Sequence, residues 1–465
     1  ARAAIVDLSN GRRVWTYRDL KDASDRLAGV LARGGIGRGD RVAILLPQRA
    51  EVMVAHLAAM KLGAVSLPLF TLFGPDALAA PLDLADLTLR IDADDWDLSG
   101  PPIAEVADTG ADDPAMMIYT SGTTGTPKGV LHAHRFLIGH LPCVETALEG
   151  FPVEGDVGWT PADWAWIGGL MDLAMPCLWF GVPLVAKRFT KFDADAAWAL
   201  MVAEGVTASF LPPTALKLLR RTKVPRGLAL RAVLSGGEAL GADLLDWGRD
   251  ALGVPINEIY GQTECNLVMA SCAGTQDLRP GTLGRGVPGV EVAVLAADGQ
   301  DVRVGETGEI CTRGSPAAFL RYWNKPEETV GKWRDGWLRT GDIGRRETDG
   351  VITYISRDDD VITSSGYRIG PSEIETCLTG HPDVVMCAVV GLPDPRRGEA
   401  VTAFVVAPDR GPDLENELIS RVSAQISPHM TPRSVQFVDN LPMTATGKIL
   451  RRALRESENE SDVRK

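Results

Sequence analysis

The sequence predicts an α/β fold: a large N-terminal domain of parallel α/β subdomains plus a distorted β-barrel, and a small α+β C-terminal domain. Two observations predict this class. The first half of the chain alternates short apolar runs with helical patterns, whereas short alternating strands and Asp-Gly turns follow after about residue 280. Strands that alternate with helices are typical of a mostly parallel sheet, and tight turns between strands are typical of antiparallel pairing.

One repeated pattern indicates the parallel part. Residues 41–47 form a buried strand pattern, residues 51–62 place apolar side chains on one helical face, and residues 64–68 form the next strand pattern. A strand, a helix and a strand in this order predict a parallel β-α-β unit. The pattern recurs in a strand at 181–186, a helix at 194–204 and strands at 208–211 and 230–235.

The second half of the chain predicts two further parts. Strands at 290–295, 308–312 and 351–355, with turns at Asp298-Gly299 and Asp349-Gly350, place the barrel at roughly 280–356. Strands at 384–390 and 400–406 and a helix at 414–426 then form a separate unit. We therefore expect an N-terminal domain at 1–356, a hinge at 357–360 and a C-terminal domain at 361–465.

Composition narrows the class of function. The net charge of −13 over 465 residues argues against nucleic acid or an anionic membrane as the main partner. The seven cysteines are dispersed, with no C-x-x-C pair, which indicates reduced thiols and a cytoplasmic location. The chain has no apolar run of about 18 residues, so no membrane span is expected, and its N-terminus shows no signal pattern. Because the chain starts abruptly, we expect residues upstream of Ala1.

A loop rich in glycine and hydroxyl groups follows the apolar run 116–119. It reads Thr120-Ser121-Gly122-Thr123-Thr124-Gly125-Thr126-Pro127-Lys128-Gly129. Glycines let backbone N–H groups turn toward an anion, hydroxyls add donors, and Lys128 adds a positive charge. The loop therefore predicts polyphosphate binding. It is not a Walker A loop, which needs Gly-Lys-Ser/Thr, because Pro127 precedes Lys128 and Gly129 follows it.

The loop resembles the signature of the adenylate-forming superfamily, which includes acyl-CoA synthetases, luciferases and peptide-synthetase adenylation domains. Other segments similar to that superfamily follow in order: Ser235-Gly236-Gly237-Glu238-Ala239, Tyr260-Gly261-Gln262-Thr263-Glu264, Thr340-Gly341-Asp342, residues 356–375, and Pro442-Met443-Thr444-Ala445-Thr446-Gly447-Lys448. Residues 356–375 most closely resemble medium-chain acyl-CoA synthetases, although these usually have Gly where Ser356 stands. The resemblance implies ATP, Mg²⁺ and coenzyme A, with a carboxylic acid as the substrate.

The resemblance also implies a nucleotide site. The second and third of these segments would enclose the adenine, with the ring of Tyr260 stacked on it. Asp342 would accept both ribose hydroxyls, Arg357 would bind ribose or phosphate, and Glu264 would hold Mg²⁺. The implied nucleotide-binding residues are Thr120, Ser121, Gly122, Thr123, Thr124, Gly125, Thr126, Lys128, Gly237, Glu238, Ala239, Glu258, Tyr260, Gly261, Gln262, Asp342 and Arg357.

By the same resemblance, the catalytic residues would be Lys448, Thr263, Glu264 and Arg368. Lys448 would follow the charge that develops on the carboxylate and the α-phosphate, and Thr263 would contact the α-phosphate or the acid. The mobile C-terminal domain would then turn about Asp359, the hinge residue, to bring the coenzyme A site to the adenylate. The implied coenzyme A residues are Ser365, Gly366, Tyr367, Arg397 and Arg433.

The acyl pocket would be formed by Trp164, Trp166, Ile167, Gly168 and Gly261. Acetyl-CoA synthetases, by resemblance, have Trp where Gly261 stands and Thr where Gly168 stands. A missing Trp would open volume beside the carboxylate unless another side chain refills it. We therefore expect an acid larger than acetate: medium-chain, branched or aromatic.

Two patterns predict no site. Residues 284–289 match G-x-G-x-x-G, but a strand pattern follows where a dinucleotide site needs a helix. His132, His134 and His140 are not expected to form a metal site, because histidines at the start of a helix that follows such a loop are common. Residues 73–97 predict no continuous helix or strand, and relatives typically have more residues between Pro68 and Tyr119.

Several alternatives stay open. An acetyl- or propionyl-CoA synthetase, an acyl-AMP ligase that loads a carrier protein, a peptide-synthetase adenylation domain and a luciferase-type oxygenase share these motifs. A nucleotide-binding module without catalysis is the alternative from another class, although Glu264, Asp342 and Lys448 argue against it. We expect the acid, ATP and coenzyme A as partners, no nucleic acid and no membrane span, and a homo-oligomer is compatible with the sequence.

Overall fold

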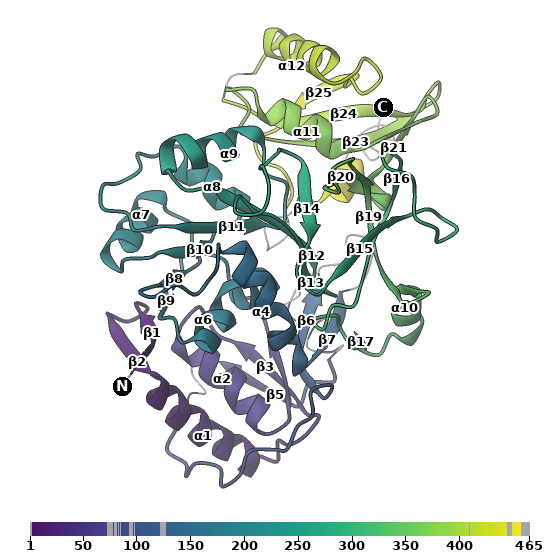
Figure 1. Ribbon diagram of the computed structural model, residues 1–465. Coiled ribbons are helices and arrows are strands. Elements are labelled where there is room, and N and C mark those ends of the chain that lie inside the picture. The colour runs from purple at the N-terminus through teal and green to yellow at the C-terminus, as the bar shows by residue number, and fades with distance from the viewer. Residues whose placement is uncertain are drawn as a thin grey trace.

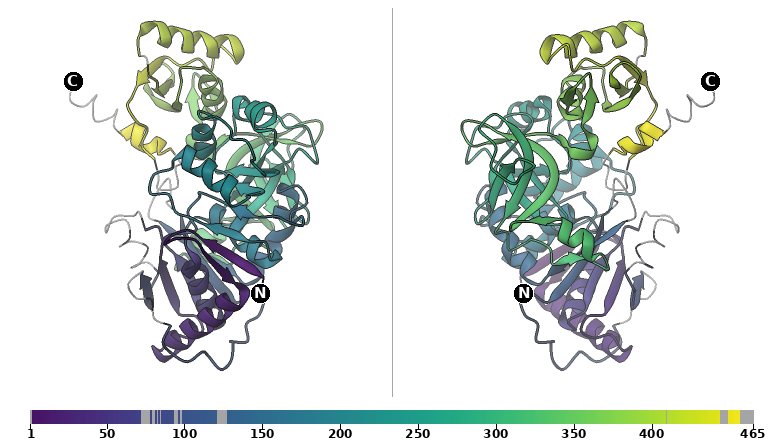
Figure 2. Two further views of the ribbon diagram at one scale, coloured as in Figure 1. Left: turned by 90° about the vertical axis from the view of Figure 1, so that its left-hand side faces the viewer. Right: turned by 90° about the vertical axis from the view of Figure 1, so that its right-hand side faces the viewer.

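A computed structural model describes residues 2–71, 78, 81, 83, 85–92, 96, 98–120, 127–408, 410–443 and 449–456, and of Arg368 only the backbone. Three sheets organise the chain. The N-terminal elements lie at one end of the molecule, and the C-terminal sheet with its helices lies at the other (Figure 1). Two views from the sides show the same arrangement (Figure 2).

The largest sheet has 14 strands, and its parallel part contains most of the predicted strands of the first half. Parallel pairs join β12 to β11, β11 to β10, β10 to β8, β8 to β9 and β9 to β1, and β2 closes this edge in antiparallel pairing. The bounds are β1 (Ala3–Asp7), β2 (Arg13–Thr16), β8 (Gly158–Trp159), β9 (Leu184–Ala186), β10 (Ala208–Phe210), β11 (Ala232–Gly236) and β12 (Ile256–Gln262).

The antiparallel part continues the same sheet beyond β12. Here the strand order is β12-β13-β14-β20-β19-β16-β15, with β18 paired to β19. The bounds are β13 (Asn266–Ser271), β14 (Thr282–Gly286), β15 (Glu291–Leu295), β16 (Thr307–Arg313), β18 (Trp333–Arg334), β19 (Trp337–Arg346) and β20 (Ile352–Arg357). The strands predicted for the barrel are therefore present. After the G-x-G-x-x-G match comes a strand, β15, as expected.

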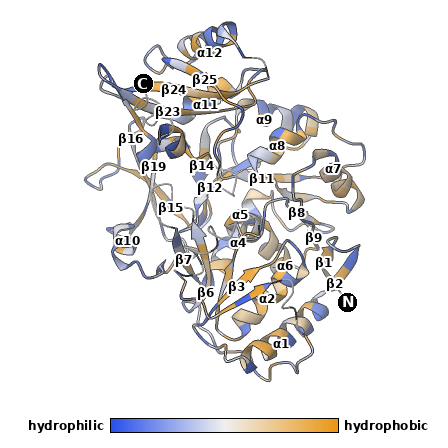
Figure 3. Cartoon of the chain, turned by 180° about the vertical axis from the view of Figure 1, so that it is seen from behind, coloured by the Kyte–Doolittle hydropathy of each residue, from blue (hydrophilic) through white to orange (hydrophobic). Residues whose placement is uncertain are grey.

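A second sheet holds the segment that enters and leaves the predicted phosphate loop. Its order is β17-β7-β6-β4-β3-β5, with β4, β3, β5 and β6 parallel where they pair. The bounds are β3 (Arg41–Leu45), β4 (Val65–Pro68), β5 (Leu89–Asp92), β6 (Pro114–Thr120), β7 (Lys128–Ala133) and β17 (Arg321–Tyr322). Strand β3 consists mainly of apolar residues (Figure 3), which is typical of a strand with both faces covered.

Strand β5 lies within residues 73–97, for which the sequence predicts no continuous helix or strand. Leu89–Asp92 forms a strand that pairs with β3 in parallel, from Val42↔Leu89 to Leu45↔Asp92. The alternation Leu-Arg-Ile-Asp buries one side chain, Ile91, at the sheet edge. Four residues with a single buried apolar side chain give too weak a periodic signal for prediction from sequence.

Helices cover the two larger sheets. Helix α1 (Tyr17–Arg33) begins with a capping box, in which the Thr16 hydroxyl accepts from Asp19 N–H and the Asp19 carboxylate accepts from Thr16 N–H. The other helical segments are α2 (Ala50–Lys61), α4 (Arg135–Ala147), α5 (Ile167–Gly169), η2 (Leu170–Ala174), α6 (Met175–Phe180), α7 (Ala194–Ala203), α8 (Pro213–Leu219), α9 (Ala242–Trp247), η3 (Gly248–Leu252) and α10 (Pro326–Gly331).

The third sheet consists only of residues that follow the predicted hinge. Its five strands are β21 (Ile362–Ser364), β22 (Tyr367–Ile369), β23 (Met386–Asp394), β24 (Gly398–Val406) and β25 (Ser434–Phe437), and its helices are α11 (Pro371–Thr379) and α12 (Pro412–Gln425). Leu378, Val389, Val405 and Leu418 belong to one core that contains no residue before Ile362. A separate sheet and core are what a separate domain requires. Within the described part of the chain, no helix is long and apolar enough to cross a membrane.

Candidate active site

The site lies where two neighbouring parallel strands end. Strand β11 ends at Gly236, which pairs with Ile259 of β12, so the turn 237–239 lies beside residues 260–264, which are the last three residues of β12 and the turn that follows. In parallel α/β sheets, ligands bind at this carboxyl edge. The structure thus brings together the two segments predicted to enclose a nucleotide base. Gly237 has a φ of 97°, which favours glycine at this turn.

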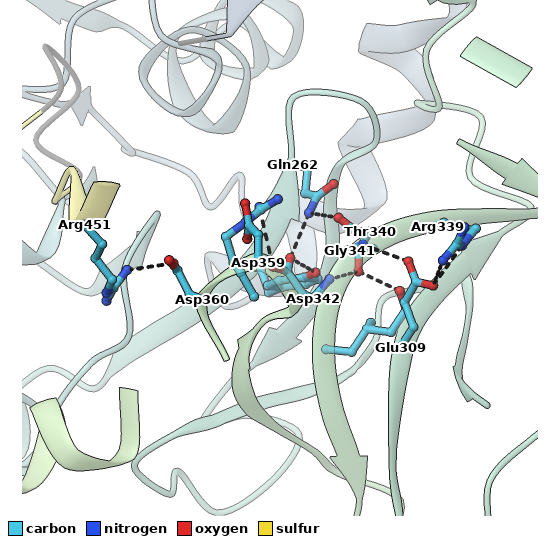
Figure 4. Close-up of polar contacts among 12 residues, drawn as sticks. Gln262, Glu309, Arg339, Thr340, Gly341, Asp342, Asp359, Asp360 and Arg451 are labelled. Atoms are coloured by element: carbon cyan, nitrogen blue, oxygen red, sulfur yellow. Dashed lines mark hydrogen bonds and ion pairs between the residues drawn. The ribbon is translucent and has the colours of Figure 1, made fainter. Parts of the chain in front are cut away.

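Asp342 joins this edge to the antiparallel strands (Figure 4). Its Oδ2 accepts from the Tyr260 hydroxyl at 2.5 Å and from Gln262 Nε2 at 2.8 Å. Burial raises the pKa of Asp342, while the positive charge of Arg357 opposes this rise. Burial and Asp342 together raise the pKa of Tyr260, so its hydroxyl remains a donor. A carboxylate has about four acceptor positions, so Asp342 keeps acceptor positions beyond these two donors.

Arg357 stands directly opposite Asp342 across strands β19 and β20. Its Nη1 lies 3.6 Å from Asp342 Oδ1, and its Nε donates to Asp359 Oδ1 at 3.0 Å. Burial lowers the pKa of Arg357, but the charges of Asp342 and Asp359 raise it by more, so the guanidinium stays positive. The guanidinium thus links the predicted ribose ligand to the predicted hinge residue.

Glu258 lies inside the protein, between the two turns. Its side chain is buried, and its Oε1 accepts from the backbone N–H of Leu240 at 3.3 Å. Burial raises the pKa of Glu258 to about 8. The structure therefore places Glu258 as a link between the turns at the base of the site, whereas Gly237, Ala239 and Gly261 are exposed at its surface.

Glu264 contacts a segment that the sequence did not indicate. Its Oε1 accepts from the Tyr322 hydroxyl at 2.5 Å, and its backbone carbonyl accepts from Phe319 N–H at 2.8 Å. Lys128 Nζ lies 5.1 Å from the centre of the Tyr322 ring. The structure thus brings Lys128, which ends the predicted phosphate loop, close to the predicted Mg²⁺ ligand. An aromatic residue in a two-residue strand carries too little pattern for this role to be predicted.

Some predicted residues lie outside the part of the chain that the structure describes. These are Ser121, Gly122, Thr123, Thr124, Gly125, Thr126, Lys448 and the side chain of Arg368. The ends of both loops are described. Thr120 pairs with Lys128 across β6 and β7, and Met443 forms a bridge with Ile449.

Two glycines of the predicted acyl pocket lie close to other segments of the chain. An added Cβ at Gly261 would lie 1.5 Å from the carbonyl oxygen of Asn266, and one at Gly168 would lie 3.0 Å from the rings of Phe210 and Trp166. Both glycines therefore lie against atoms of other segments, and a larger side chain at either position would have to displace them.

Of the two tryptophans in the set, Trp166 lies at the surface of the site. Its ring is half-buried, packs against Phe210 at 5.3 Å between centroids, and would contact a Cβ at Gly237 at about 3.2 Å. Ile167 is buried beside it, and Trp164 is fully buried in the main core. Sequence reasoning missed Phe210, whose place beside Trp166 depends on sheet packing.

Three of the predicted coenzyme A residues meet at one turn of the third sheet. Ser365 has a φ of 52° and donates its N–H to the Arg397 carbonyl at 2.8 Å. Gly366 has a φ of 84°, with open space where a side chain would point. Tyr367 is half-exposed and stacks on His429 at 4.4 Å. Arg433 is exposed and precedes β25, on the other side of β24 from β23.

The predicted hinge is fastened to the segment that follows Lys448. Asp360 accepts from Arg451 at 3.3 Å (Figure 4) and from Arg455 at 2.9 Å, and Arg451 also pairs with Glu375 at 2.7 Å. These residues surround the short 3₁₀ helix η4 (Asp358–Asp360). These contacts hold Arg451 and Arg455, which follow Lys448 in the sequence, beside the hinge.

The histidines have an acidic neighbour that the sequence did not reveal. His140 Nε2 lies 3.2 Å from Asp172 Oδ1, and the Asn266 amide contacts the same ring at 3.0 Å. Burial lowers the pKa of His132 to about 3, so this ring is neutral. Within the described residues, no group of three or more His, Cys, Asp or Glu side chains could hold a metal ion. The contacts of His140 are structural links between helix α4, the segment η2 and strand β13.

Comparison with known proteins agrees with this geometry. The family model of AMP-binding enzymes matches residues 1–105 and 90–323, and that of the AMP-binding enzyme C-terminal domain matches residues 373–448. The chain belongs to this family of AMP-binding enzymes. Within the family it is an AMP-forming acid–CoA ligase of the acyl-CoA synthetase group, which uses a carboxylate, ATP and coenzyme A.

The human mitochondrial acyl-coenzyme A synthetase ACSM4 is 33% identical over 491 residues, which cover 96% of this chain and 84% of that protein. The uncharacterized acyl–CoA ligase YtcI of Bacillus subtilis is 30% identical and covers 99% and 93%. A benzoate CoA ligase from Burkholderia xenovorans has a similar structure, with a TM-score of 0.88, 27% identity and coverage of 98% and 96%. The first alignment is longer than this chain of 465 residues, so ACSM4 carries residues that this chain lacks.

Proposed function

We propose that this site converts a carboxylate and ATP into an acyl-adenylate and pyrophosphate, and then transfers the acyl group to coenzyme A. The junction of Tyr260, Gln262 and Asp342 carries the proposal. It combines a flat ring for a purine with a buried carboxylate for ribose hydroxyls, at the edge of the sheet where ligands bind.

For the nucleotide, Gly237, Glu238, Ala239 and Tyr260 would hold the adenine, and Asp342 and Arg357 the ribose. Lys128 and the hydroxyl loop would bind the phosphates. Attack of a carboxylate on the α-phosphate brings two anions together, so the site must supply positive charge and position both groups. Lys448 and Arg368 would supply that charge, and Thr263 would orient the reacting carboxylate or phosphate.

The residues present fit Mg²⁺ as the cofactor. Mg²⁺ typically takes one or two carboxylates and completes its octahedron with phosphate oxygens and water. Glu264 offers one carboxylate at the surface of the site, and its Oε2 has no hydrogen-bond partner among the described residues. Bound there, Mg²⁺ would neutralise phosphate charge as pyrophosphate leaves.

For the second step, we propose that residues 361–465 form a domain that turns about Asp359 and brings Ser365, Gly366 and Tyr367 to the adenylate. The open space and positive φ at Gly366 fit the passage of a narrow thiol-bearing arm. Arg397 and Arg433 would bind coenzyme A phosphates. The thiol then attacks the mixed anhydride and AMP leaves.

For the acid, we propose a substrate larger than acetate: a medium-chain, branched or aromatic acid. The half-buried ring of Trp166 with Phe210 behind it offers a flat apolar wall. Solved structures similar to this chain include a benzoate CoA ligase and an anthranilate CoA ligase, both above 25% identity. An acetyl-coenzyme A synthetase of Bacillus subtilis is also 29% identical, so acetate is the competing acid. The seven free thiols fit a cytoplasmic location.

A panel of acids tests this function. Acetate, butyrate, hexanoate and benzoate are each supplied with ATP and Mg²⁺, with and without coenzyme A, and AMP release is measured. We expect the highest kcat/KM for one of the three larger acids and AMP release that depends on coenzyme A.

The outcomes separate the alternatives. A higher kcat/KM for acetate than for every other acid would refute the proposed size class. Acid-dependent exchange of pyrophosphate into ATP without coenzyme A-dependent release would indicate a carrier-protein ligase. A lack of exchange with every acid would support a nucleotide-binding module without catalysis.

A further inference from the structure

Tyr322 occupies a fixed position between two parts of the proposed phosphate site. It pairs with Val130 of β7, only two residues beyond Lys128. The backbone N–H groups of Leu320 and Trp323 donate to Leu131 and Gly129, each at 2.8 Å. The side chain is 3% exposed and packs against Phe319 at 5.0 Å between ring centres. The ring therefore cannot move far without breaking this strand pair.

The two charged groups beside Tyr322 have opposite signs. The hydroxyl of Tyr322 donates to Glu264 Oε1 at 2.5 Å, and Lys128 Nζ lies 5.1 Å from the ring centre. The latter distance is within the range of a cation–π contact. Between these two described residues there is no direct ion pair.

A direct ion pair would be harmful at a nucleotide site. If the Lys128 ammonium bound the Glu264 carboxylate, each would have to lose that partner before it could bind a phosphate or a cation. An aromatic ring that holds the ammonium on its face and the carboxylate at its hydroxyl satisfies both groups only partly. Each charge then keeps positions for a ligand.

We propose that Tyr322 is a positioning residue that keeps Lys128 and Glu264 apart, so that the ammonium is ready for phosphate and the carboxylate for Mg²⁺. The inference rests on the proposed roles of these two residues and adds a third. Because Phe319 N–H also binds the Glu264 carbonyl, the segment 319–322 fixes both the backbone and the side chain of Glu264.

The chemistry of the phenol supports this role. The hydroxyl of Tyr322 donates to Glu264 and carries no charge, so it does not compete with phosphate as an anion. A phenylalanine would keep the ring and lose only the hydrogen bond.

The test measures equilibrium binding of ATP, without acid, during a Mg²⁺ titration of the full chain, with calorimetry as the readout. Because the hydrogen bond that positions the Glu264 carboxylate is lost, we expect Tyr322→Phe to raise the Mg²⁺ concentration at which ATP binding is half-maximally tightened roughly ten-fold, which is about 1.4 kcal/mol. Affinity for AMP should stay unchanged. In Tyr322→Leu the ring is lost as well, so Lys128 can pair with Glu264 and Mg²⁺-free ATP should also bind more weakly.

The matched control is Tyr17→Phe. Tyr17 is the first residue of α1, and its hydroxyl donates to the Leu178 carbonyl at 2.7 Å. This variant should leave the Mg²⁺ titration unchanged. Equal weakening of AMP and ATP binding in Tyr322→Phe, or an unchanged Mg²⁺ titration in that variant, would overturn the proposal.

Glu264→Gln separates this inference from the function on which it rests. If Glu264→Gln abolishes the Mg²⁺ effect and Tyr322→Phe preserves it, only the role of Tyr322 is refuted. If Glu264→Gln titrates like the unmodified chain, the metal role of Glu264 is refuted, and that of Tyr322 with it.

Discussion

At the scale of single residues, Glu258 shows how the fold changes the chemistry of one carboxyl group. Its ordinary pKa of 4.5 is raised to about 8 by burial, and the single backbone donor, Leu240, only partly offsets that rise. A protonated carboxyl can remain inside the protein at neutral pH without a counter-charge. Glu258 therefore links the two turns as a neutral group.

This pKa makes stability depend on pH. Below pH 4.5 both the folded and unfolded chains hold the proton of Glu258. As pH rises toward 8, the unfolded chain loses the proton and the folded chain keeps it, so stability falls through this window. We expect Glu258→Gln to remove this dependence. As pH rises through the window, the free energy of unfolding of the variant should increase relative to that of the unmodified chain by up to about 1.4 kcal/mol per pH unit.

Urea unfolding at several pH values across this window measures the effect. Glu327→Gln, on the exposed surface of α10, serves as the control and should show a constant difference. A difference between Glu258→Gln and the unmodified chain that stays constant with pH would contradict the buried, neutral state of Glu258.

At the scale of elements, the hairpin of β12 and β13 shapes the site. Asn266, with a φ of 51°, directs its carbonyl to the place where a side chain at Gly261 would stand. His140 and Asp172 lie against the Asn266 amide and so support this end of the hairpin from two other elements. The turn with Thr263 and Glu264 is thus fixed by contacts behind it.

We expect Gly261→Ala to destabilise the chain by about 1–3 kcal/mol, because the new Cβ overlaps the Asn266 carbonyl and the backbone must shift. Denaturant midpoints measure this loss. Gly37→Ala is the matched control, since an added Cβ there meets no atom within 4 Å. An alanine tolerated equally at both positions would mean that Gly261 and Leu267 do not pair in this register.

At the scale of the whole molecule, one site would serve two half-reactions. The third sheet has its own core, and the segment that follows Lys448 is held by Arg451 and Arg455 against Asp360, beside the proposed hinge. A rotation of residues 361–465 would therefore carry the Lys448 loop and the Ser365–Tyr367 turn together, which allows one to leave as the other arrives.

Lys448→Ala tests this exchange. We expect adenylation, measured by pyrophosphate release, to fall by at least about a hundred-fold, because the charge on the α-phosphate is no longer stabilised. Thioester formation from supplied acyl-AMP and coenzyme A should remain largely intact. Lys465→Ala is the control, since Lys465 is the other lysine after residue 360. Equal loss of both half-reactions would refute the two-conformation mechanism.

Much of the fold could be predicted, because local patterns decide strands and helices. The periodicity around residues 41–68 predicted β3, α2 and β4 within a few residues. The close neighbours of Gly168 and Gly261, which come from Phe210 and Asn266, could not be predicted, because they depend on sheet packing and on a hairpin bulge. For the same reason, the sequence did not show that Asp172 lies beside His140.

By itself, the sequence determined the order of the motifs: a hydroxyl loop, a Y-G-Q-T-E segment, a T-G-D turn and a final lysine. That order defines carboxylate activation, since each motif carries its residue types in a short contiguous stretch. Only the tertiary structure decided which side chains meet across long separations, such as Tyr260 with Asp342 and Tyr322 with Glu264. The physical reason is that local propensity acts over a few residues, whereas these contacts depend on how sheets pack against one another.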